Sequence, residues 1–182
     1  MRQLINSTYT TLDGVVEGPH LWPPLKGGSS AEGDSIQTDL LEACDIVLMG
    51  RRTYESFAPA WSSRGGDRFS DRINTMRKVV VSTTLTDPDW KNTEVIAGDV
   101  VARVRDLKAE GGGHIVQYGF GDVSRLLLTH GLFDQLQLWI HPQLVGPSDA
   151  SDLLSRPGTT AALDLVDTTV LSNGIVLATY AP

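Results

Sequence analysis

The sequence contains a single cysteine, Cys44, among its 182 residues. One cysteine forms no internal disulfide and cannot supply a zinc site built from several thiolates. Long apolar runs are also absent, because the stretch 46–49 is far shorter than the roughly 20 residues that span a bilayer. No basic segment followed by an apolar one precedes the first predicted strand, so we expect a cytoplasmic protein that contacts no membrane.

Positive charge is scarce as well. Fifteen Lys and Arg face 22 Asp and Glu, which gives a net charge of -7, and this balance argues against nucleic acid as a partner. The segment 51–78 nevertheless holds seven basic and three acidic residues, so it carries +4 while the remainder carries -11. A cationic surface on an acidic protein suits a small anionic ligand, and we expect a small-molecule substrate.

Several classes of active site lack their motifs. The four histidines have no metal-ligand spacing, so we expect no metal site, and neither G-x-S-x-G nor G-x-x-x-x-G-K occurs. Hydrophobic residues make up 41% of the chain and charged residues 20%, which is typical of a globular protein. The length fits one domain, residues 1–182.

Short apolar runs alternate with helical patterns along most of the chain, which predicts an α/β fold with three layers, α/β/α. The runs are continuously apolar, as in the strands of a parallel sheet covered on both faces. Near the end of the chain, period-two stretches flank Asn173-Gly174 and predict an antiparallel hairpin. The predicted strands are 4–5, 46–49, 79–81, 95–96, 115–116, 136–140 and 175–180, and the predicted helices are 34–44, 53–58, 99–110 and 122–130.

The turn after strand 46–49 combines a glycine, two arginines and a threonine. The carboxyl edge of a parallel sheet is where ligands bind, and the N-terminus of a following helix attracts anions. Gly50 would allow close approach, Arg51 would pair with phosphate oxygens, and Thr53 would cap the helix and donate a hydroxyl. These residues fit a phosphate pocket, and they equally fit a solvated basic turn at the start of a helix.

Two further strand ends carry polar or glycine-rich turns. Ser82 and Thr83 follow strand 79–81, and Gly119 and Gly121 follow strand 115–116 and lead into a helix that we expect Asp122 to cap. The second turn departs from the dinucleotide fingerprint G-x-G-x-x-G at its third glycine. Three such turns on one edge would hold an extended cofactor with several phosphates.

The segment "MGRRTYES" resembles the G-R-x-T segment of the dihydrofolate reductase superfamily. The likeness is closer to the reductase domain of the riboflavin-biosynthesis deaminase-reductase and its stand-alone relatives, through "TTLDGVV", "MGRRTYESF", "VSRLLLTHGLFDQLQLWIHPQLVG" and "SNGIVLATY". The resemblance implies a dihydrofolate reductase-like fold and an NADPH-dependent reductase of a pterin, folate or ribosylamino-pyrimidine compound. It also implies that the cofactor contacts are Gly50, Arg51, Thr53, Ser82, Thr83, Gly119, Gly121, Asp122 and Val123.

On the substrate side, the resemblance implies that residues 8–16 bound the site of hydride transfer, with Asp13 as the catalytic polar group. A turn aspartate that fixes its own backbone is an equally good interpretation of Asp13. The carboxylate that orients dihydrofolate in the superfamily has two candidates here, Asp34 and Asp39. Phe120 stands where dihydrofolate reductases have a second glycine.

Two alternatives to the reductase remain open at this point. The chain could bind a nucleotide without turnover, or it could be a relative that uses a flavin. The alternation of Leu136, Leu138 and Ile140 with Gln137 and Trp139 suggests an apolar strand edge, and from this edge we expect a homodimer.

Overall fold

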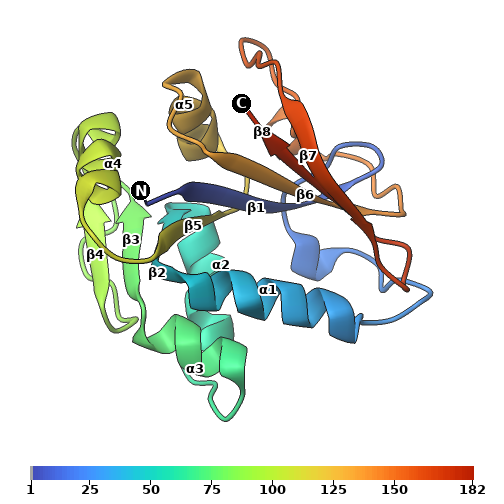
Figure 1. Cartoon of the computed structure of the whole chain (residues 1–182), viewed down its shortest axis with the longest axis horizontal. Coiled ribbons are helices and arrows are strands. Elements are labelled where there is room, and N and C mark those ends of the chain that lie inside the picture. Colours follow the sequence, from blue (N-terminus) through green and yellow to red (C-terminus); the bar gives the residue numbers. More distant parts are fainter. Residues whose placement is uncertain (1) are drawn as a thin grey trace.

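A computed structural model describes residues 2–182, in which eight strands form one sheet (Figure 1). The order across the sheet is β4-β3-β2-β5-β1-β6-β8-β7. The strands are β1 (Leu4–Thr11), β2 (Cys44–Gly50), β3 (Arg77–Val81), β4 (Thr93–Ile96), β5 (His114–Tyr118), β6 (Gln135–His141), β7 (Asp164–Val170) and β8 (Val176–Ala181).

Strands β1 to β6 run parallel to one another. At the end of the sheet β8 pairs antiparallel with β6, and the edge strand β7 pairs antiparallel with β8. The predicted α/β fold with a C-terminal hairpin is therefore confirmed. Val170 pairs with Val176 at the end of the hairpin, so its turn contains Asn173 and Gly174 as predicted.

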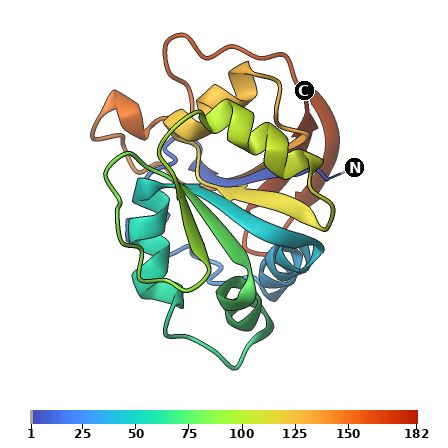
Figure 2. The same cartoon turned by 90° about the vertical axis from the view of Figure 1, so that its left-hand side faces the viewer.

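Helices cover both faces of the sheet (Figure 2). Successive strand residues point to opposite faces, so apolar strand residues pack against helices on each side. Ile46 and Leu48 of β2 pack in one cluster with α4 (Val100–Ala109) and α5 (Asp122–Thr129). Val47 and Met49 pack in a second cluster with α1 (Ala31–Ala43), α2 (Arg51–Trp61) and α3 (Arg68–Thr75). The strands are apolar on both sides for this reason.

The α3 helix is an element that the sequence patterns did not predict. The Asp67 side chain accepts a hydrogen bond from the Ser70 N–H and begins this helix, and Ile73 is its buried apolar contact. One buried apolar residue in a helix of eight residues gives a weak periodic signal. Two 3-10 turns, η1 (Pro19–Leu21) and η2 (Ala150–Asp152), lie in the loops.

The expectation that residues 51–78 form one cationic surface is wrong, because the fold places their charges at opposite edges of the sheet. Arg51 and Arg52 lie at the carboxyl edge, whereas Arg77 and Lys78 begin β3 at the opposite edge. Lys78 is fully buried, and Arg77 forms an ion pair with Glu94.

The argument for an apolar strand edge in β6 is also wrong, because β6 lies between β1 and β8 inside the sheet. Leu136 is buried, and the exposed edge strand is β7, where Leu165, Val166 and Val170 face solvent. The homodimer stays a prediction that has lost this support. Within residues 2–182, no helix is long and apolar enough to cross a membrane.

Candidate functional site at the carboxyl ends of β2 and β5

The order of connections in the sheet reverses between β2 and β5. The chain leaves β2 through α2 toward β3 and β4, and it leaves β5 through α5 toward β6 on the other side. Helices α2 and α5 belong to opposite faces of the sheet, so their N-termini approach the same point from both sides. In open α/β sheets this reversal at the carboxyl ends is where ligands bind. We call residues 50–53 and 119–123 the β2/β5 edge.

Of the five α-helices in residues 2–182, the two that begin at the β2/β5 edge are the two without a side-chain cap. Ser30, Asp67 and Asp99 each cap the helix that follows them, α1, α3 and α4. In contrast, α2 begins at Gly50 and α5 begins at Gly121, and neither glycine can supply a capping oxygen. The first N–H groups of both helices are therefore free to bind an anion.

These starts correct two predictions. Thr53 is the third residue of α2 and does not cap it, and Asp122 is the first residue of α5 and not its cap. Asp122 instead forms an exposed ion pair with Arg156 at 2.9 Å.

The turns of the β2/β5 edge touch each other. A Cβ atom on Gly119 would lie 3.0 Å from the Thr53 hydroxyl oxygen, and one on Gly50 would lie 3.6 Å from a methyl group of Val123. Gly119 has φ +80°, a backbone conformation that is strained for a residue with a side chain. Its peptide bond to Phe120 is trans. Thr53 and Gly119 are 66 residues apart in the sequence, Gly50 and Val123 are 73 residues apart, and the sheet brings them into contact.

The remaining predicted cofactor residues lie at the same edge with other partners. Arg51 pairs with Glu55 on the surface of α2 at 2.9 Å. Gly50 is level with Val81 in the sheet, so Ser82 and Thr83 follow beside the turn of Arg51. The Ser82 hydroxyl accepts N–H bonds from Thr84 and Leu85 in its own turn, and Thr83 is exposed. Their role in cofactor binding stays a prediction.

Asp13 is held by hydrogen bonds to the loops that follow β1 and β6. Its carboxylate accepts hydrogen bonds from the Thr11 hydroxyl, from the Gly146 N–H at 2.7 Å and from the Val145 N–H at 3.2 Å. The Thr11 hydroxyl and the backbone N–H groups hold the pKa of Asp13 below its ordinary value. An ionised carboxylate with these partners anchors a loop and is a poor proton donor; its catalytic role stays a prediction.

A cavity of about 160 Å³ opens on the α1 side of β1 and β6. Its floor is aromatic, since the Tyr9 ring lies 5.8 Å from Trp139 and 4.9 Å from His141 between ring centroids. The N-terminus of α1 and the hairpin turn around Asn173 complete its walls. Trp22 packs edge-on against His141 next to it.

The cavity separates the two carboxylates that the sequence left as candidates. Asp34 lines it and is close enough to Tyr9 to raise the pKa of that phenol, after the larger effect of burial. Asp39, about one turn later, pairs with Arg68 on the outer surface at 3.2 Å. Of the two, Asp34 is the one that lines the cavity.

Comparison with known proteins places this geometry in a family. Residues 2–177 match the model of the RibD C-terminal domain. The chain belongs to the RibD C-terminal domain family. Membership supports an oxidoreductase, with the reductase-type fold that the sheet order shows.

Individual relatives are distant in sequence. The uncharacterized protein YyaP of Bacillus subtilis is 26% identical over 189 residues, covering 98% of this chain and 94% of that protein. A structure named as a putative riboflavin biosynthesis protein from Shewanella sp. PV-4 has TM-score 0.73 at 18% identity, covering 100% of this chain and 98% of that one. A pyrimidine reductase-like protein from Corynebacterium diphtheriae has TM-score 0.73 at 17% identity, with 99% and 91% covered.

A bifunctional protein has the same fold in part of its length. The diaminohydroxyphosphoribosylaminopyrimidine deaminase/5-amino-6-(5-phosphoribosylamino)uracil reductase of Thermotoga maritima has TM-score 0.65 at 15% identity, covering 100% of this chain and 56% of that one. At these identities the likeness shows the fold of the RibD C-terminal domain. In residues 2–182, no three His, Cys, Asp or Glu side chains gather into a possible metal site.

His141 lines the cavity of this RibD C-terminal domain but was not predicted from the sequence, and Tyr9 was included only as part of the range 8–16. Both lie in strands, where an aromatic residue usually signals packing. A signal exists in the run of polar residues 6–11, because a buried parallel strand is otherwise apolar. Asn6 and Ser7 are nearly inaccessible, so β1 carries polar side chains into the centre of the molecule.

Proposed function

We propose that this protein is an NADPH-dependent reductase that transfers a hydride to a pterin, folate or ribosylamino-pyrimidine compound. The observation that carries the proposal is the contact between two uncapped helix N-termini at the β2/β5 edge. Membership of the RibD C-terminal domain family supports the reductase chemistry.

The residues at this edge fit a dinucleotide phosphate. Gly119 leaves space that a Cβ would fill against Thr53, so the backbone is open to close approach by phosphate oxygens. The N–H groups at the start of α2 and α5 would donate to the pyrophosphate. Arg51 is half exposed and paired only with Glu55, a surface pair of small energy, so it can turn to a 2′-phosphate.

The chain's own task in such a reaction is to bind and orient. The nicotinamide would supply the hydride. Asn6 donates to the Gly119 carbonyl at 2.9 Å and to Gln117 at 2.6 Å, which fixes the turn from below. Ser124 also donates to the Gly119 carbonyl at 3.0 Å, so the turn is held by two buried side chains before any ligand arrives.

The test is titration of the purified protein with NADPH and NADH, followed by oxidation of NADPH across a panel of pterins, folates and ribosylaminopyrimidines. We expect saturable NADPH binding, and Arg51→Ala should weaken NADPH about tenfold or more, because a charge-assisted hydrogen bond to phosphate contributes about 1.5–3 kcal/mol. The affinity for NADH, which lacks the 2′-phosphate, should fall much less in this variant.

Arg105→Ala is the matched control. Arg105 is exposed on α4 at the opposite edge of the sheet, so both dinucleotides should bind this variant as they bind the wild type. Absence of NADPH binding at tens of micromolar would contradict the proposal. Binding without oxidation of any compound would favour a nucleotide-binding module, and a yellow purified protein would favour a flavin.

A further inference from the structure

Two arginine side chains lie close together beside the N-terminus of α5, and neither has a full set of hydrogen-bond acceptors. Arg125 is the fourth residue of α5, and Arg156 belongs to the loop that follows η2. Burial lowers the pKa of Arg125, and the neighbouring charge of Arg156 lowers it further. Three of their nitrogen atoms are buried without an acceptor in residues 2–182, namely Nε and Nη1 of Arg125 and Nε of Arg156.

One carboxylate balances this pair of charges. Among the described residues, Asp122 is the acidic residue in ion-pair contact with either guanidinium, and its carboxylate lies 2.9 Å from Nη1 of Arg156. The first N–H groups of α5 add partial positive charge at the same place, because this helix has no side-chain cap. Two guanidinium groups and a helix N-terminus therefore face one carboxylate, and a further anion would neutralise the excess.

The Asp122 carboxylate is itself easily displaced. Its side chain is 93% exposed, whereas the side chain of Arg156 is 16% exposed. An ion pair with one partner in water contributes little, so the carboxylate can turn to solvent at small cost. A phosphate oxygen in its place would accept the same N–H group of Arg156 while the guanidinium stays where it is.

The loop that carries Arg156 is held in position by Arg125. The Arg125 guanidinium donates to the carbonyls of Leu153 and Leu154 at 2.8 and 3.3 Å. It also lies over the Phe120 ring, 5.2 Å from the centroid, and so joins this loop to the glycine turn at residues 119–121. Arg156 is therefore fixed before any ligand binds.

Arg156 belongs to the same edge of the sheet as the start of α2. Asp149, the residue before η2, has a pKa below its ordinary value, mainly because of its hydrogen bonds with Ser151. The charges of Arg156 and Arg52 lower this pKa further, so both arginines lie near Asp149. Arg52 is the second residue of α2, which places Arg156 between the two uncapped helices of the β2/β5 edge.

We propose that Arg156 binds the pyrophosphate of the dinucleotide and that the Asp122 carboxylate occupies its position until the cofactor displaces it. The inference rests on the proposed function and adds to it a residue outside the two glycine turns. Arg125 is the positioning residue for Arg156. Because NADPH and NADH share the pyrophosphate, Arg156 sets the affinity for both dinucleotides, whereas Arg51 sets the preference between them.

The test is titration of Arg156→Ala with NADPH and NADH, together with adenosine 2′-monophosphate measured by competition with NADPH. We expect both dinucleotides to bind about tenfold more weakly and by similar factors, since each loses a charge-assisted hydrogen bond. Adenosine 2′-monophosphate has no pyrophosphate and should bind as it does to the wild type. Arg51→Ala should give the opposite pattern, with weaker binding of NADPH and adenosine 2′-monophosphate and little change for NADH.

Asp122→Asn keeps the size of the side chain and removes the competing charge. We expect this variant to bind both dinucleotides about threefold more tightly and adenosine 2′-monophosphate as the wild type does. Asp122 is exposed, so this variant keeps the inference testable if Arg156→Ala fails to fold in thermal unfolding. Arg105→Ala, at the opposite edge of the sheet, is the control and should bind all three ligands as the wild type does.

The inference and the proposed function fail in different ways. If the wild type binds NADPH and Arg156→Ala binds both dinucleotides equally well, the reductase stands and the role of Arg156 is wrong. An equal loss of adenosine 2′-monophosphate in Arg156→Ala would show that the whole site has collapsed and would also overturn this role. Unchanged or weaker dinucleotide binding by Asp122→Asn would refute the displacement of Asp122, and a wild type that binds neither dinucleotide would contradict both proposals.

Discussion

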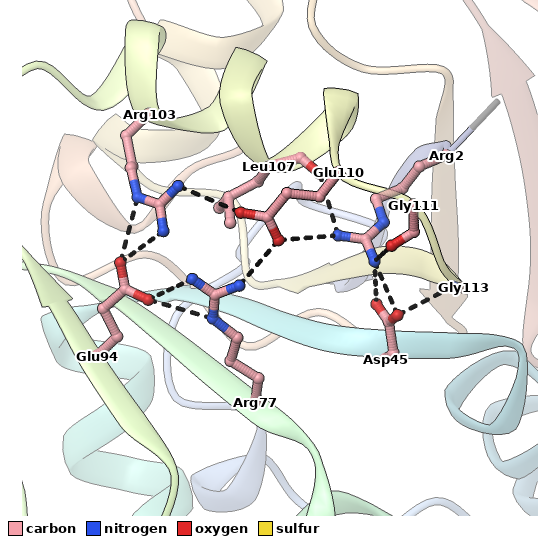
Figure 3. A network of polar contacts seen from close by, with 9 residues as sticks. All are labelled: Arg2, Asp45, Arg77, Glu94, Arg103, Leu107, Glu110, Gly111 and Gly113. Atoms are coloured by element: carbon pink, nitrogen blue, oxygen red, sulfur yellow. Dashed lines mark hydrogen bonds and ion pairs between the residues drawn. The ribbon is translucent and has the colours of Figure 1, made fainter.

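The two edges of the parallel sheet use charged residues in opposite ways. At the amino edge, three arginines and three carboxylates alternate in one chain of contacts (Figure 3). Arg103 contacts Glu94 at 2.8 Å, Glu94 contacts Arg77 at 2.6 Å, and Arg77 contacts Glu110 at 2.9 Å. The chain continues from Glu110 to Arg2, 3.8 Å away, and ends at Asp45, 2.7 Å from Arg2.

At the carboxyl edge, glycine turns and separate ion pairs replace this network. Arg51 pairs within its own helix, Arg52 approaches Glu17 at 3.8 Å, and both arginines are substantially exposed. The free N–H groups of α2 and α5 lie beside them. Charges that satisfy one another hold the fold, whereas charges and N–H groups without strong partners are available to a ligand.

Judged by volume alone, the amino edge of the sheet would be selected as the binding site. A hollow of about 760 Å³, larger than the cavity over β1 and β6, lies at the amino edge beside Arg2, Arg105 and Lys108. These side chains surround the C-terminal turn of α4, where positive charge complements the helix dipole. Lys108 is also paired with Asp134 at 2.6 Å, so the basic residues here have a structural explanation.

The largest effect on stability is expected from Arg2→Met. Arg2 is buried and donates to Asp45 and to the carbonyls of Leu107 and Gly111, so its removal takes one donor from each of these three groups. We expect the free energy of unfolding in urea to fall by about 3 kcal/mol, the low end for a broken buried pair because Asp45 is partly exposed. Arg105→Met should change it by less than about 0.5 kcal/mol. A similar loss in both variants would contradict a specific role for the network.

A smaller effect, visible through its pH dependence, is expected at Lys78. This ammonium group donates to the carbonyls of Asn74, Met76 and Lys91 and lies over the Trp90 ring, and burial lowers its pKa from 10.5 to about 8. Between these two pH values the unfolded chain holds a proton that the folded chain has released, so stability rises with pH.

The measurement compares wild type with Lys78→Met at pH 7.5 and pH 10. Over this interval the free energy of unfolding of the wild type should rise by about 2 kcal/mol relative to that of the variant, because the interval covers most of the range between the folded and unfolded pKa values of Lys78. Lys26→Met, at an exposed lysine, should follow the wild type. A constant difference between wild type and Lys78→Met would show that the Lys78 pKa is not lowered by folding.

The sequence predicted what depends on local pattern. The apolar runs of β2, β3 and β5 and the glycine turns after β2 and β5 were found because their signals lie within a few residues. The same patterns could not show that Gly119 meets Thr53, since this contact depends on β5 inserting beside β2.

The prediction failed where charge partners are distant in the chain. Arg77 and Lys78 look like part of a cationic surface with Arg51 in sequence, yet Arg77 finds Glu94 and Glu110, and Lys78 enters the core. The cavity was missed for the same reason, because Tyr9, Asp34 and His141 come from three elements that only the folded sheet and α1 bring together.

The smallest expected effect is that of Asp13, a carboxylate at the carboxyl edge whose hydrogen bonds are satisfied within the protein, as are those of the charges at the amino edge. Asp13 holds residues 145–146 through backbone N–H bonds, and its low pKa keeps it ionised at neutral pH. We expect Asp13→Asn to lower turnover by less than about fivefold without moving the acid limb of the pH–rate profile, since loss of a general acid costs roughly 10²–10⁴-fold. A hundredfold loss of turnover with a shifted pH–rate profile would instead identify Asp13 as the proton donor. The loop above β1 would then contain a ligand-facing charge in place of a structural one.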